Sequence, residues 1–235
     1  MKKKLVVLTG AGISAESGLK TFRDMGGLWE QYDVMEVASI DGWYRNPQLV
    51  LKFYNDRRKQ LETALPNAGH NGLVDLEKYF DVYVITQNVD NLHEKAGSRN
   101  ILHLHGELTK VRSATYEEDI KDIGYGELNW GDKCSRGTQL RPHIVWFGEA
   151  VPAIEEAAEI TQTADAFAVV GTSLNVYPAA GLISYVPKFA PIFLIDPNDV
   201  PLSMPGRVEI IKEKAGVGVE KMKKKLLENF NLTQL

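Results

Sequence analysis

Three separate polar segments of this chain contain residue types that could bind a nucleotide and act on it. The first runs from Gly10 to Gly18 and reads GAGISAESG, the second is Thr86–Asp90 (TQNVD), and the third is the pair His105–Gly106. A glycine turn lets backbone N–H groups approach a phosphate, which favours nucleotide binding. Amide, carboxylate and imidazole side chains in the other two segments indicate chemistry on that nucleotide.

The glycine segment fits a dinucleotide-binding pattern in the right context. Gly10–Ala15 matches G-x-G-x-x-[GA] directly after the apolar run Leu5–Leu8, where a tight turn that merely needs small residues is the alternative. A hydride-transferring dehydrogenase would next show an acidic residue about 20 positions on, at the end of a second strand. Glu30 and Asp33 lie in that range, but no apolar strand precedes them. The pattern therefore favours an enzyme that consumes NAD over one that exchanges hydride with it.

A parallel sheet must position these segments. Apolar runs typical of buried strands, and residues at helical spacing, alternate along the chain. The expected strands are Leu5–Leu8, Asp81–Ile85, Ala164–Val170 and Pro191–Ile195, and the expected helices are Pro47–Leu61, His70–Tyr79 and Val219–Phe230. This alternation predicts an α/β fold with a doubly wound parallel sheet. Polar or glycine residues follow each strand, at the edge where such sheets bind ligands.

The segment Thr109–Leu140 interrupts this alternation. It is polar, contains glycines and has little apolar periodicity. Residues 22–44 show no clean period either, so loops and short helices are expected there. We interpret residues 1–235 as one catalytic domain, within which about 20–65 and 109–140 form a small inserted module.

Composition limits the classes of function. The chain has 235 residues, of which 44% are hydrophobic and 25% charged, and a net charge of −4. This is an ordinary globular mixture without the basic surface typical of nucleic-acid binding. No apolar run approaches the roughly 20 residues of a membrane span. The single cysteine, Cys134, fits a reducing compartment, so we expect a cytoplasmic protein without membrane or nucleic-acid partners, and the oligomeric state stays open.

Five runs resemble the Sir2 (sirtuin) family of NAD-dependent protein-lysine deacylases, in the family's order and spacing. They are Gly10–Asp24, Thr86–Gly97, His103–Gly106, Arg141–Glu149 and Gly171–Leu182, and they span most of the chain. The resemblance implies a large Rossmann-like domain and a small module, with NAD and substrate bound between them.

The resemblance also implies roles for the catalytic residues. The family pattern places its general base directly before a glycine, which selects His105 over His103. Without that context, a lone histidine is more often a satisfied core or surface residue than a catalytic one. Asn88 is implied to position water or the ribose, and Asp90 to bind the nicotinamide carboxamide, although Asn and Asp after a strand also serve as helix caps.

NAD contacts are implied at the ends of several strands. Ser14, Phe22 and Arg23 would hold the nicotinamide end, and Asp196 would accept from ribose hydroxyls and disfavour a 2′-phosphate, so NAD is expected over NADP. The full expected set is Gly10, Ala11, Gly12, Ser14, Ala15, Phe22, Arg23, Gln87, Asn88, Asp90, Gly171, Thr172, Ser173, Asp196 and Ala215.

Two further segments are implied to bind the acylated substrate. The run Val145, Trp146, Phe147, Gly148 and Glu149 would pair with a peptide backbone, as an extended edge can. Tyr54 and Arg57 share a helix face and resemble the Tyr-x-x-Arg pair of sirtuins that remove acidic acyl groups. A phenol beside a guanidinium can bind a carboxylate. The alternative is an aromatic core contact beside a solvated arginine, and Arg58 is expected to be solvated.

The family's structural zinc is not expected here. Most sirtuins bind zinc with four cysteines, but this chain has only Cys134, and Ser113 occupies the usual first position. A tetrahedral structural site needs four good ligands. Packing must then hold the module together, and the candidate residues are Tyr116, Ile120, Ile123, Tyr125, Leu128 and Trp130.

These observations predict an NAD-dependent protein-lysine deacylase. It would remove acetyl groups and, through Tyr54 and Arg57, succinyl or malonyl groups from acylated proteins or peptides. NAD would be consumed, giving nicotinamide and 2′-O-acyl-ADP-ribose. The alternatives are an ADP-ribosyltransferase, an NAD hydrolase and a catalytically weak NAD-binding sensor.

Overall fold

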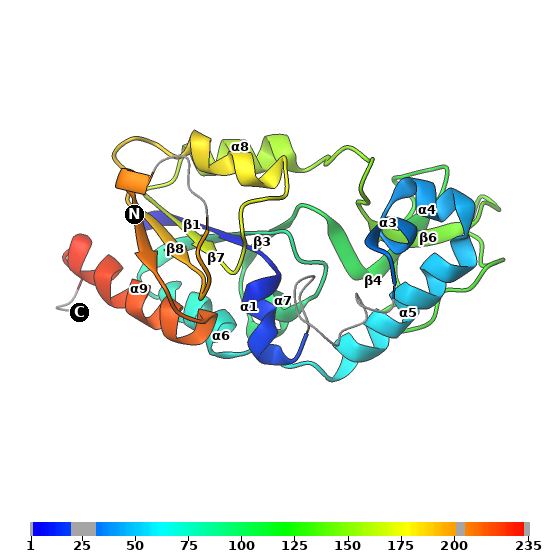
Figure 1. The fold of residues 1–235 in the computed structure, drawn as a ribbon, viewed down its shortest axis with the longest axis horizontal. Helices are drawn as coiled ribbons and strands as arrows, with labels where there is room; N and C mark the ends of the chain where they lie inside the picture. The colour runs from blue at the N-terminus through cyan, green and yellow to red at the C-terminus, as the bar shows by residue number, and fades with distance from the viewer. Residues whose placement is uncertain (1, 20–31, 201–204, 233–235) are drawn as a thin grey trace.

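A six-stranded parallel sheet forms the larger part of the computed structural model, which describes residues 2–19, 32–200 and 205–232 (Figure 1). In spatial order the strands are β3 (Asn100–His103), β2 (Phe80–Thr86), β1 (Lys3–Thr9), β7 (Ala166–Val170), β8 (Ile192–Ile195) and β9 (Val208–Ile211). β1 is central, and its residue Val7 pairs with Val84 of β2 and Ala168 of β7. The doubly wound parallel sheet predicted from the sequence is therefore confirmed.

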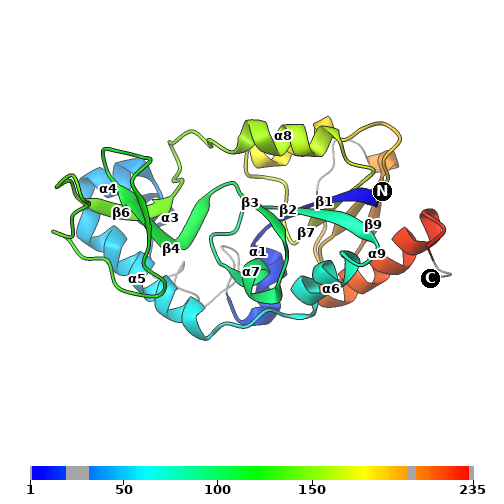
Figure 2. The same cartoon turned by 180° about the vertical axis from the view of Figure 1, so that it is seen from behind.

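Helices cover both faces of this sheet (Figures 1 and 2). α6 (Ala68–Leu76) and α9 (Ala215–Asn229) pack on one face, where Leu5 and Val7 point. α8 (Ile154–Gln162) and the 3₁₀ helix η2 (Ala179–Tyr185) pack on the other, where Val6 and Leu8 point. Successive residues of a strand face opposite sides of the sheet. Because helices cover both sides, both sets of residues must be apolar, and the apolar run of each strand is continuous.

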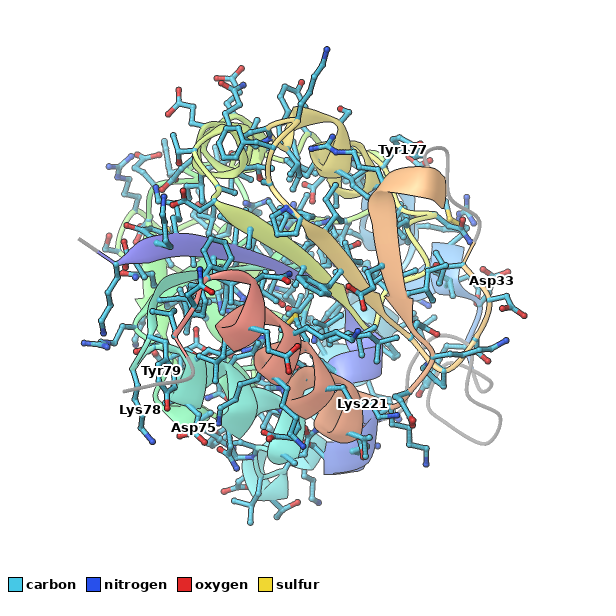
Figure 3. The ribbon with its side chains drawn as sticks, turned by 90° about the vertical axis from the view of Figure 1, so that its left-hand side faces the viewer. Asp33, Asp75, Lys78, Tyr79, Tyr177 and Lys221 are labelled. Carbon is cyan, nitrogen blue, oxygen red and sulfur yellow. The ribbon has the colours of Figure 1, made fainter. Side chains whose placement is uncertain are left out.

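α6 and α9, which pack on the same face of the sheet, also contact each other at the protein surface. Seen from the end of the sheet, Asp75 and Lys78 lie near the end of α6, and Lys221 lies on α9 (Figure 3). Lys223 of α9 is 3.8 Å from the Asp75 carboxylate. Such exposed ion pairs contribute little, about 0–1 kcal/mol, so the shared apolar core is what holds α6 against α9.

A second group of elements lies at the opposite end of the molecule from α9 (Figure 1). It contains α3 (Val34–Val37), α4 (Ile40–Arg45), α5 (Pro47–Thr63) and an antiparallel sheet of β5 (Ile120–Asp122), β4 (Gly106–Ser113) and β6 (Leu140–Ile144). Its own apolar core includes Phe53, Tyr54, Val111 and Trp146. We call these elements the α5–β4 unit.

Packing inside the α5–β4 unit differs from the sequence prediction. Leu128 is buried, and Ile123 and Tyr125 pack against the core, but Ile120 and Trp130 are 46% and 55% exposed. Ile120 lies on the edge strand β5, and Trp130 packs over Trp43 with ring centroids 6.3 Å apart. The helices α4 and α5 supply the apolar surface that those two residues were expected to provide.

Short elements complete the described chain. At the carboxyl edge of the main sheet are α1 (Ala11–Ser14), the 3₁₀ helix η1 (Ala15–Ser17) and α7 (Leu92–Ala96), and the 3₁₀ helix η3 (Pro205–Arg207) lies at the opposite edge, directly before β9. Gly18, with φ of +83°, ends η1, so the expected helix after the glycine turn is only two short pieces. No helix in the described part of the chain is long and apolar enough to cross a membrane.

Candidate active site

The turns that follow β1 and β7 are in direct backbone contact. Gly10 N–H donates to Val170 O at 3.0 Å, and Gly12 N–H donates to Gly171 O at 2.8 Å. A Cβ on Gly12 would lie 2.6 Å from Gly171 Cα, and Gly171 itself has a φ of +66°. Glycine is required here because the two turns touch, a reason that the sequence pattern alone does not reveal.

Asn88 and Asp90 join the β2 end to the glycine turn. The Asn88 side-chain amide donates to Gly10 O at 3.1 Å and to Ser14 Oγ at 3.2 Å. Ser14 Oγ in turn donates to Asp90 Oδ2 at 2.9 Å, and Leu92 N–H donates to the other oxygen at 3.1 Å. All three side chains are buried, so the structure brings together the residues predicted from two distant segments.

Burial also changes the acidity of Asp90. Desolvation raises the pKa of this carboxyl, while the bonds from Leu92 and Ser14 and the charges of His103 and Arg57 oppose the rise. The net direction is upward. A carboxylate with a raised pKa is a stronger hydrogen-bond acceptor, which suits it to an amide N–H of a ligand.

His105 lies between β3 and β4 with a defined tautomer. Its Nδ1 is 2.9 Å from Gln87 O. A carbonyl only accepts, so Nδ1 carries the proton and Nε2 keeps its lone pair. Burial lowers the pKa of His105, and the Gln87 bond opposes this. The ring is therefore neutral at neutral pH, and Nε2 can accept a proton.

His103 also donates through Nδ1 to a backbone carbonyl, that of Asn88, but unlike His105 it has a carboxylate partner at Nε2. Its Nδ1 is 3.0 Å from Asn88 O and its Nε2 is 2.8 Å from Glu94 Oε1. Burial lowers the pKa of His103, but the hydrogen bond and charge of Glu94 outweigh it, so the net pKa is raised. His103 thus tends toward a cation that braces Asn88, and Glu94 is a partner that sequence reasoning missed.

The remaining expected NAD residues follow β2, β7 and β8 or begin α9. Gln87 Nε2 donates to Thr172 Oγ1 at 3.1 Å, next to the half-buried Ser173. Asp196 is buried at the end of β8 and accepts from Asn198 N–H at 2.9 Å. Ala215, the first residue of α9, is buried in the core that α6 and α9 share with the sheet.

Some expected residues are half-buried, exposed or outside the described part. Ala11 is half-buried and Ala15 is exposed. Phe22 and Arg23 lie outside the described residues.

A small cavity lies between the α5–β4 unit and residues 87–91, the loop between β2 and α7 that we call the Asn88 loop. It is lined by Leu19, Arg57, Gln60, Leu61, Asp90 and Leu108. Burial lowers the pKa of Arg57, and the nearby Tyr54 and Asp90 oppose this. The guanidinium therefore lies within electrostatic reach of its predicted partner Tyr54 and of Asp90, with which it lines the same cavity.

Tyr54 is 3% exposed, and its hydroxyl accepts a hydrogen bond from a residue that follows β6. Trp146 Nε1 donates to Tyr54 Oη at 2.9 Å. Burial raises the pKa of Tyr54 to about 12, against the opposing effects of Arg57 and Trp146. The phenol keeps its proton at neutral pH and has it available to donate.

The arginine expected to be solvated beside this pair is instead the most buried arginine among the described residues. Arg58 is 0% exposed and donates to the carbonyls of Gly126 and Leu108, at 2.9 and 3.3 Å, and to the Asn55 side chain. The prediction that Arg58 is solvated was wrong because its face of α5 turns toward β4. Arg58 ties the helix to the small sheet.

The expected peptide-binding run is already partly paired within the chain. Phe147 N–H donates to Ala38 O at 2.9 Å, and Phe147 O accepts from Ile40 N–H at 3.0 Å. Trp146 has a buried side chain. Val145 N–H donates to His105 O at 2.9 Å, so this run connects the predicted base to the α5–β4 unit. Gly148 and the Phe147 side chain are exposed.

Glu149 serves this run as an anchor. Arg141 donates to it through two parallel bonds of 2.7 and 2.8 Å, and Trp146 N–H donates to it at 2.8 Å. The Arg141 guanidinium also stacks 3.6 Å from the Trp146 ring centroid. No sequence pattern indicated this clamp, since Arg141 and Glu149 meet only because the chain turns after β6.

Metal-ligand side chains gather at one place in the described chain. Among residues 2–19, 32–200 and 205–232, only Glu94, His103 and Glu107 form a group whose ligand atoms all lie within 4.8 Å. Lys110 already pairs with Glu107 at 2.6 Å. Cys134 is not in this group; its Sγ is 3.0 Å from Thr138 Oγ1.

Comparisons with known proteins agree on one family. Residues 10–178 match the protein family described as the Sir2 family. A protein of Bacteroides thetaiotaomicron named NAD-dependent protein deacylase is 56% identical over 231 residues, covering 96% of this chain and 98% of that protein. A Helicobacter pylori protein of the same name is 53% identical over 228 residues, covering 96% and 98%.

The fold comparison gives the same result. A solved Sir2 homologue, a mutant in complex with ADP ribose, superposes with a TM-score of 0.88 at 36% identity. The alignment covers 100% of this chain and 96% of that one. Both the large parallel sheet and the α5–β4 unit therefore lie within the region of similarity.

Proposed function

This chain belongs to the Sir2 family and is an NAD-dependent protein deacylase, and from that premise we propose which residues perform the reaction and which acyl groups they accept. NAD is consumed as a co-substrate, and acylated proteins are the substrates. The observation that carries the residue assignment is the convergence of His105, Asn88, Asp90 and Arg57 around the ends of β1 and β2.

His105 is the general base of this proposal. The acyl-lysine carbonyl oxygen attacks the anomeric carbon of the nicotinamide ribose as nicotinamide leaves. His105 Nε2 then takes the proton of a ribose hydroxyl, and that oxygen attacks the resulting imidate. Water completes the transfer, which releases free lysine and 2′-O-acyl-ADP-ribose. The Nδ1–H bond to Gln87 O supports this role, because it fixes the lone pair on Nε2.

Asn88, Asp90 and Ser14 hold the nicotinamide ribose end in this proposal. They form one buried, hydrogen-bonded group at the β1–β2 edge, so a ligand there meets side chains that are already oriented. Asp90 accepts from the nicotinamide carboxamide, to which its raised pKa suits it. Phe22 and Arg23 remain assigned to the same end by the family resemblance.

The other half of NAD lies along the turns after β1, β7 and β8. The residues assigned to it are Gly10, Ala11, Gly12, Ala15, Gln87, Gly171, Thr172, Ser173, Asp196 and Ala215. The contact between Gln87 and Thr172 supports a continuous site across β2 and β7. The carboxylate of Asp196 repels a 2′-phosphate, which favours NAD over NADP.

Arg57 and Tyr54 give the site a preference for acidic acyl groups. Arg57 lines the cavity beside Asp90, and Tyr54 remains a protonated donor nearby. A succinyl or malonyl carboxylate entering this cavity meets the Arg57 guanidinium, and the buried Tyr54 phenol lies within electrostatic reach of that guanidinium. Such charge-assisted bonds are stronger than neutral ones, so acidic acyl groups gain binding that acetyl does not.

The acylated peptide lies against the run 145–149 in this proposal. Because Phe147 pairs with Ala38 and Ile40, the exposed Gly148 and the Phe147 ring are the parts that meet the peptide. We also assign 20–65 and 109–140 to a small module that carries this surface. The single cysteine supports a reducing, cytoplasmic setting.

Replacing Arg57 by Met tests the acyl preference. The variant should lose about 10- to 100-fold in kcat/KM for a succinyl-lysine peptide, the worth of one charged hydrogen bond of about 1.5–3 kcal/mol, and change deacetylation by less than about threefold. Lys59→Met is the matched control, because Lys59 is exposed on the same helix. Equal losses for both peptides would show that Arg57 only supports the fold.

A further inference from the structure

Two fully buried histidines lie behind the Asn88 loop, outside the roles assigned above. His70 of α6 and His93 of α7 are both 0% exposed, and their rings meet edge to face with centroids 4.9 Å apart. Each ring has one nitrogen with a hydrogen-bond partner. The other nitrogens, His70 Nε2 and His93 Nδ1, are buried without one, and such groups call for an explanation.

The partners of these rings fix where their protons lie. Asn67 N–H points at His70 Nδ1 from 3.3 Å, so that nitrogen is an acceptor and the proton is on Nε2. His93 Nε2 is 3.1 Å from Thr9 Oγ1, whose own proton is donated to Thr86 Oγ1 at 2.8 Å. Thr9 must therefore accept from His93 Nε2–H, which leaves a lone pair on His93 Nδ1. The two unpaired atoms are one donor and one acceptor.

We propose that His70 and His93 are positioning residues, whose neutral rings close a buried hydrogen-bond relay from the nucleotide turn to Asn88. In this relay His70 Nε2–H donates toward His93 Nδ1. The complementarity of the two atoms, which have no other hydrogen-bond partner, and the edge contact of their rings carry the inference. Either ring in its other tautomer would leave two unpaired donors or two unpaired acceptors on the touching rings.

The relay has defined ends on both sides of the NAD site. At one end, the Asn67 side chain donates to Ile13 O at 2.7 Å and to Ser17 Oγ at 2.9 Å, which holds α1 and η1. At the other end, Thr86 Oγ1 accepts from Asn88 N–H at 3.0 Å. The histidine pair lies between these ends, and the bond from His70 to His93 is the link that the proposal adds to the recorded hydrogen bonds.

The surroundings of the pair keep both rings neutral. Burial lowers the pKa of His70 to about 4, with Glu94 opposing. Burial also lowers the pKa of His93 well below its usual value, and His70 and His103 lower it further. Neutral rings are what the relay requires, because a protonated His93 would turn its accepting Nδ1 into a second donor.

The relay acts on the reaction through Asn88, so this part of the inference rests on the proposed function. Asn88 lies beside Ser14 and Asp90 at the ribose end of the site. A small displacement of an orienting group lowers the rate of a step that depends on precise geometry. Breaking the relay should therefore lower kcat more than it weakens NAD binding.

The tautomers can be measured directly by ¹⁵N NMR of the imidazole rings in the whole protein at pH 7. The chain has five histidines, so each is assignable by single substitution. Both His70 and His93 should be neutral with the proton on Nε2. An Nδ1–H tautomer or an imidazolium at either position would overturn the relay, whether or not the protein deacylates any peptide.

Variants test the link to catalysis. His70→Asn keeps an acceptor for Asn67 N–H, but its shorter side chain places no donor at the position of Nε2. His93→Gln keeps a donor to Thr9 but places no acceptor at the position of Nδ1. Each should lower kcat about tenfold and leave the NAD dissociation constant within about threefold. The double variant should be no slower than either single one, because one broken link already opens the relay.

Thr161→Val is the control for a merely structural effect. Thr161 is fully buried in α8 on the opposite face of the sheet and donates to Ala157 O at 2.7 Å. This variant should lose stability and keep the wild-type kcat. If the histidine variants only lose stability in the same way, or fail to fold while the wild-type tautomers differ from those assigned, the relay is contradicted.

Discussion

Two histidines of the same strand connection have pKa values that are shifted in opposite directions, because only one of them has a carboxylate partner. His103 and His105 donate through Nδ1 to the consecutive carbonyls of Asn88 and Gln87. Glu94 faces the free nitrogen of His103 and raises its pKa, whereas burial lowers the pKa of His105. The lowered pKa of His105 suits a base, and the ion pair of His103 with Glu94 suits a brace for residues 87–91.

The pH dependence of kcat should report the lowered pKa of His105. The base form is the neutral one, so activity is full above the His105 pKa and falls as pH drops through it. The acid limb should have its midpoint below 6.5, the ordinary histidine value. Glu94→Gln, which changes the charge beside His103, should leave this limb in place. A midpoint above 6.5 would contradict the assignment.

At this scale the sequence predicted residue types well and environments poorly. The residues Asn88, Asp90 and Ser14 were found from their motifs, and the structure brings them together. The burial of Arg58 was not predictable, because α5 turns that side chain toward carbonyls of residues 50 and 68 positions away. The buried pair of His70 and His93 likewise forms only when α6 meets α7.

At the scale of the elements, β4 and the loop before β6 are joined by hydroxyl groups. Ser113, which carries one of them, occupies the position where the family resemblance implies the first zinc cysteine. Ser113 Oγ and Thr138 Oγ1 are 2.6 Å apart, and Cys134 Sγ contacts the same threonine. Ser113 Oγ also accepts from the backbone N–H groups of Thr115 and Tyr116, at 3.1 and 3.0 Å. These bonds join the two segments that a metal would otherwise clamp.

Removing metals should therefore leave this protein unchanged, and removing one hydroxyl should not. Treatment with EDTA should leave the melting temperature as it was. Ser113→Ala should cost about 1–3 kcal/mol of unfolding free energy, because two backbone N–H groups lose their acceptor. Ser135→Ala, which removes an exposed hydroxyl nearby, should cost less than about 0.5 kcal/mol. A melting temperature lowered by EDTA would reveal a structural metal.

Element boundaries show which sequence patterns are reliable. The four predicted strands all exist, with ends within about two residues, because continuous apolar runs between polar residues have few alternatives in a doubly wound sheet. The strands β3 and β9 were not predicted; each has only four residues. Helix starts shifted toward capping positions, as at α6, where Asn67 accepts from Gly69 N–H.

At the scale of the whole molecule, the site lies where the two groups of elements meet. The main sheet supplies the ends of β1, β2, β7 and β8, and the α5–β4 unit supplies Arg57 and Tyr54 (Figure 1). The run from His105 through Val145 to Phe147 joins the two by backbone hydrogen bonds. In the proposed function, catalysis and acyl selection therefore come from different units of the molecule.

Product analysis by mass spectrometry tests the central claim most directly, with wild type and His105→Ala each incubated with NAD and a succinyl-lysine or acetyl-lysine peptide. The account predicts free lysine peptide, nicotinamide and O-acyl-ADP-ribose from wild type, faster with the succinyl peptide. It predicts deacylation at least about 100-fold slower in His105→Ala, the usual range for a lost general base, with NAD still bound. ADP-ribosylated peptide, plain ADP-ribose without deacylation, or an unimpaired His105→Ala variant would contradict it.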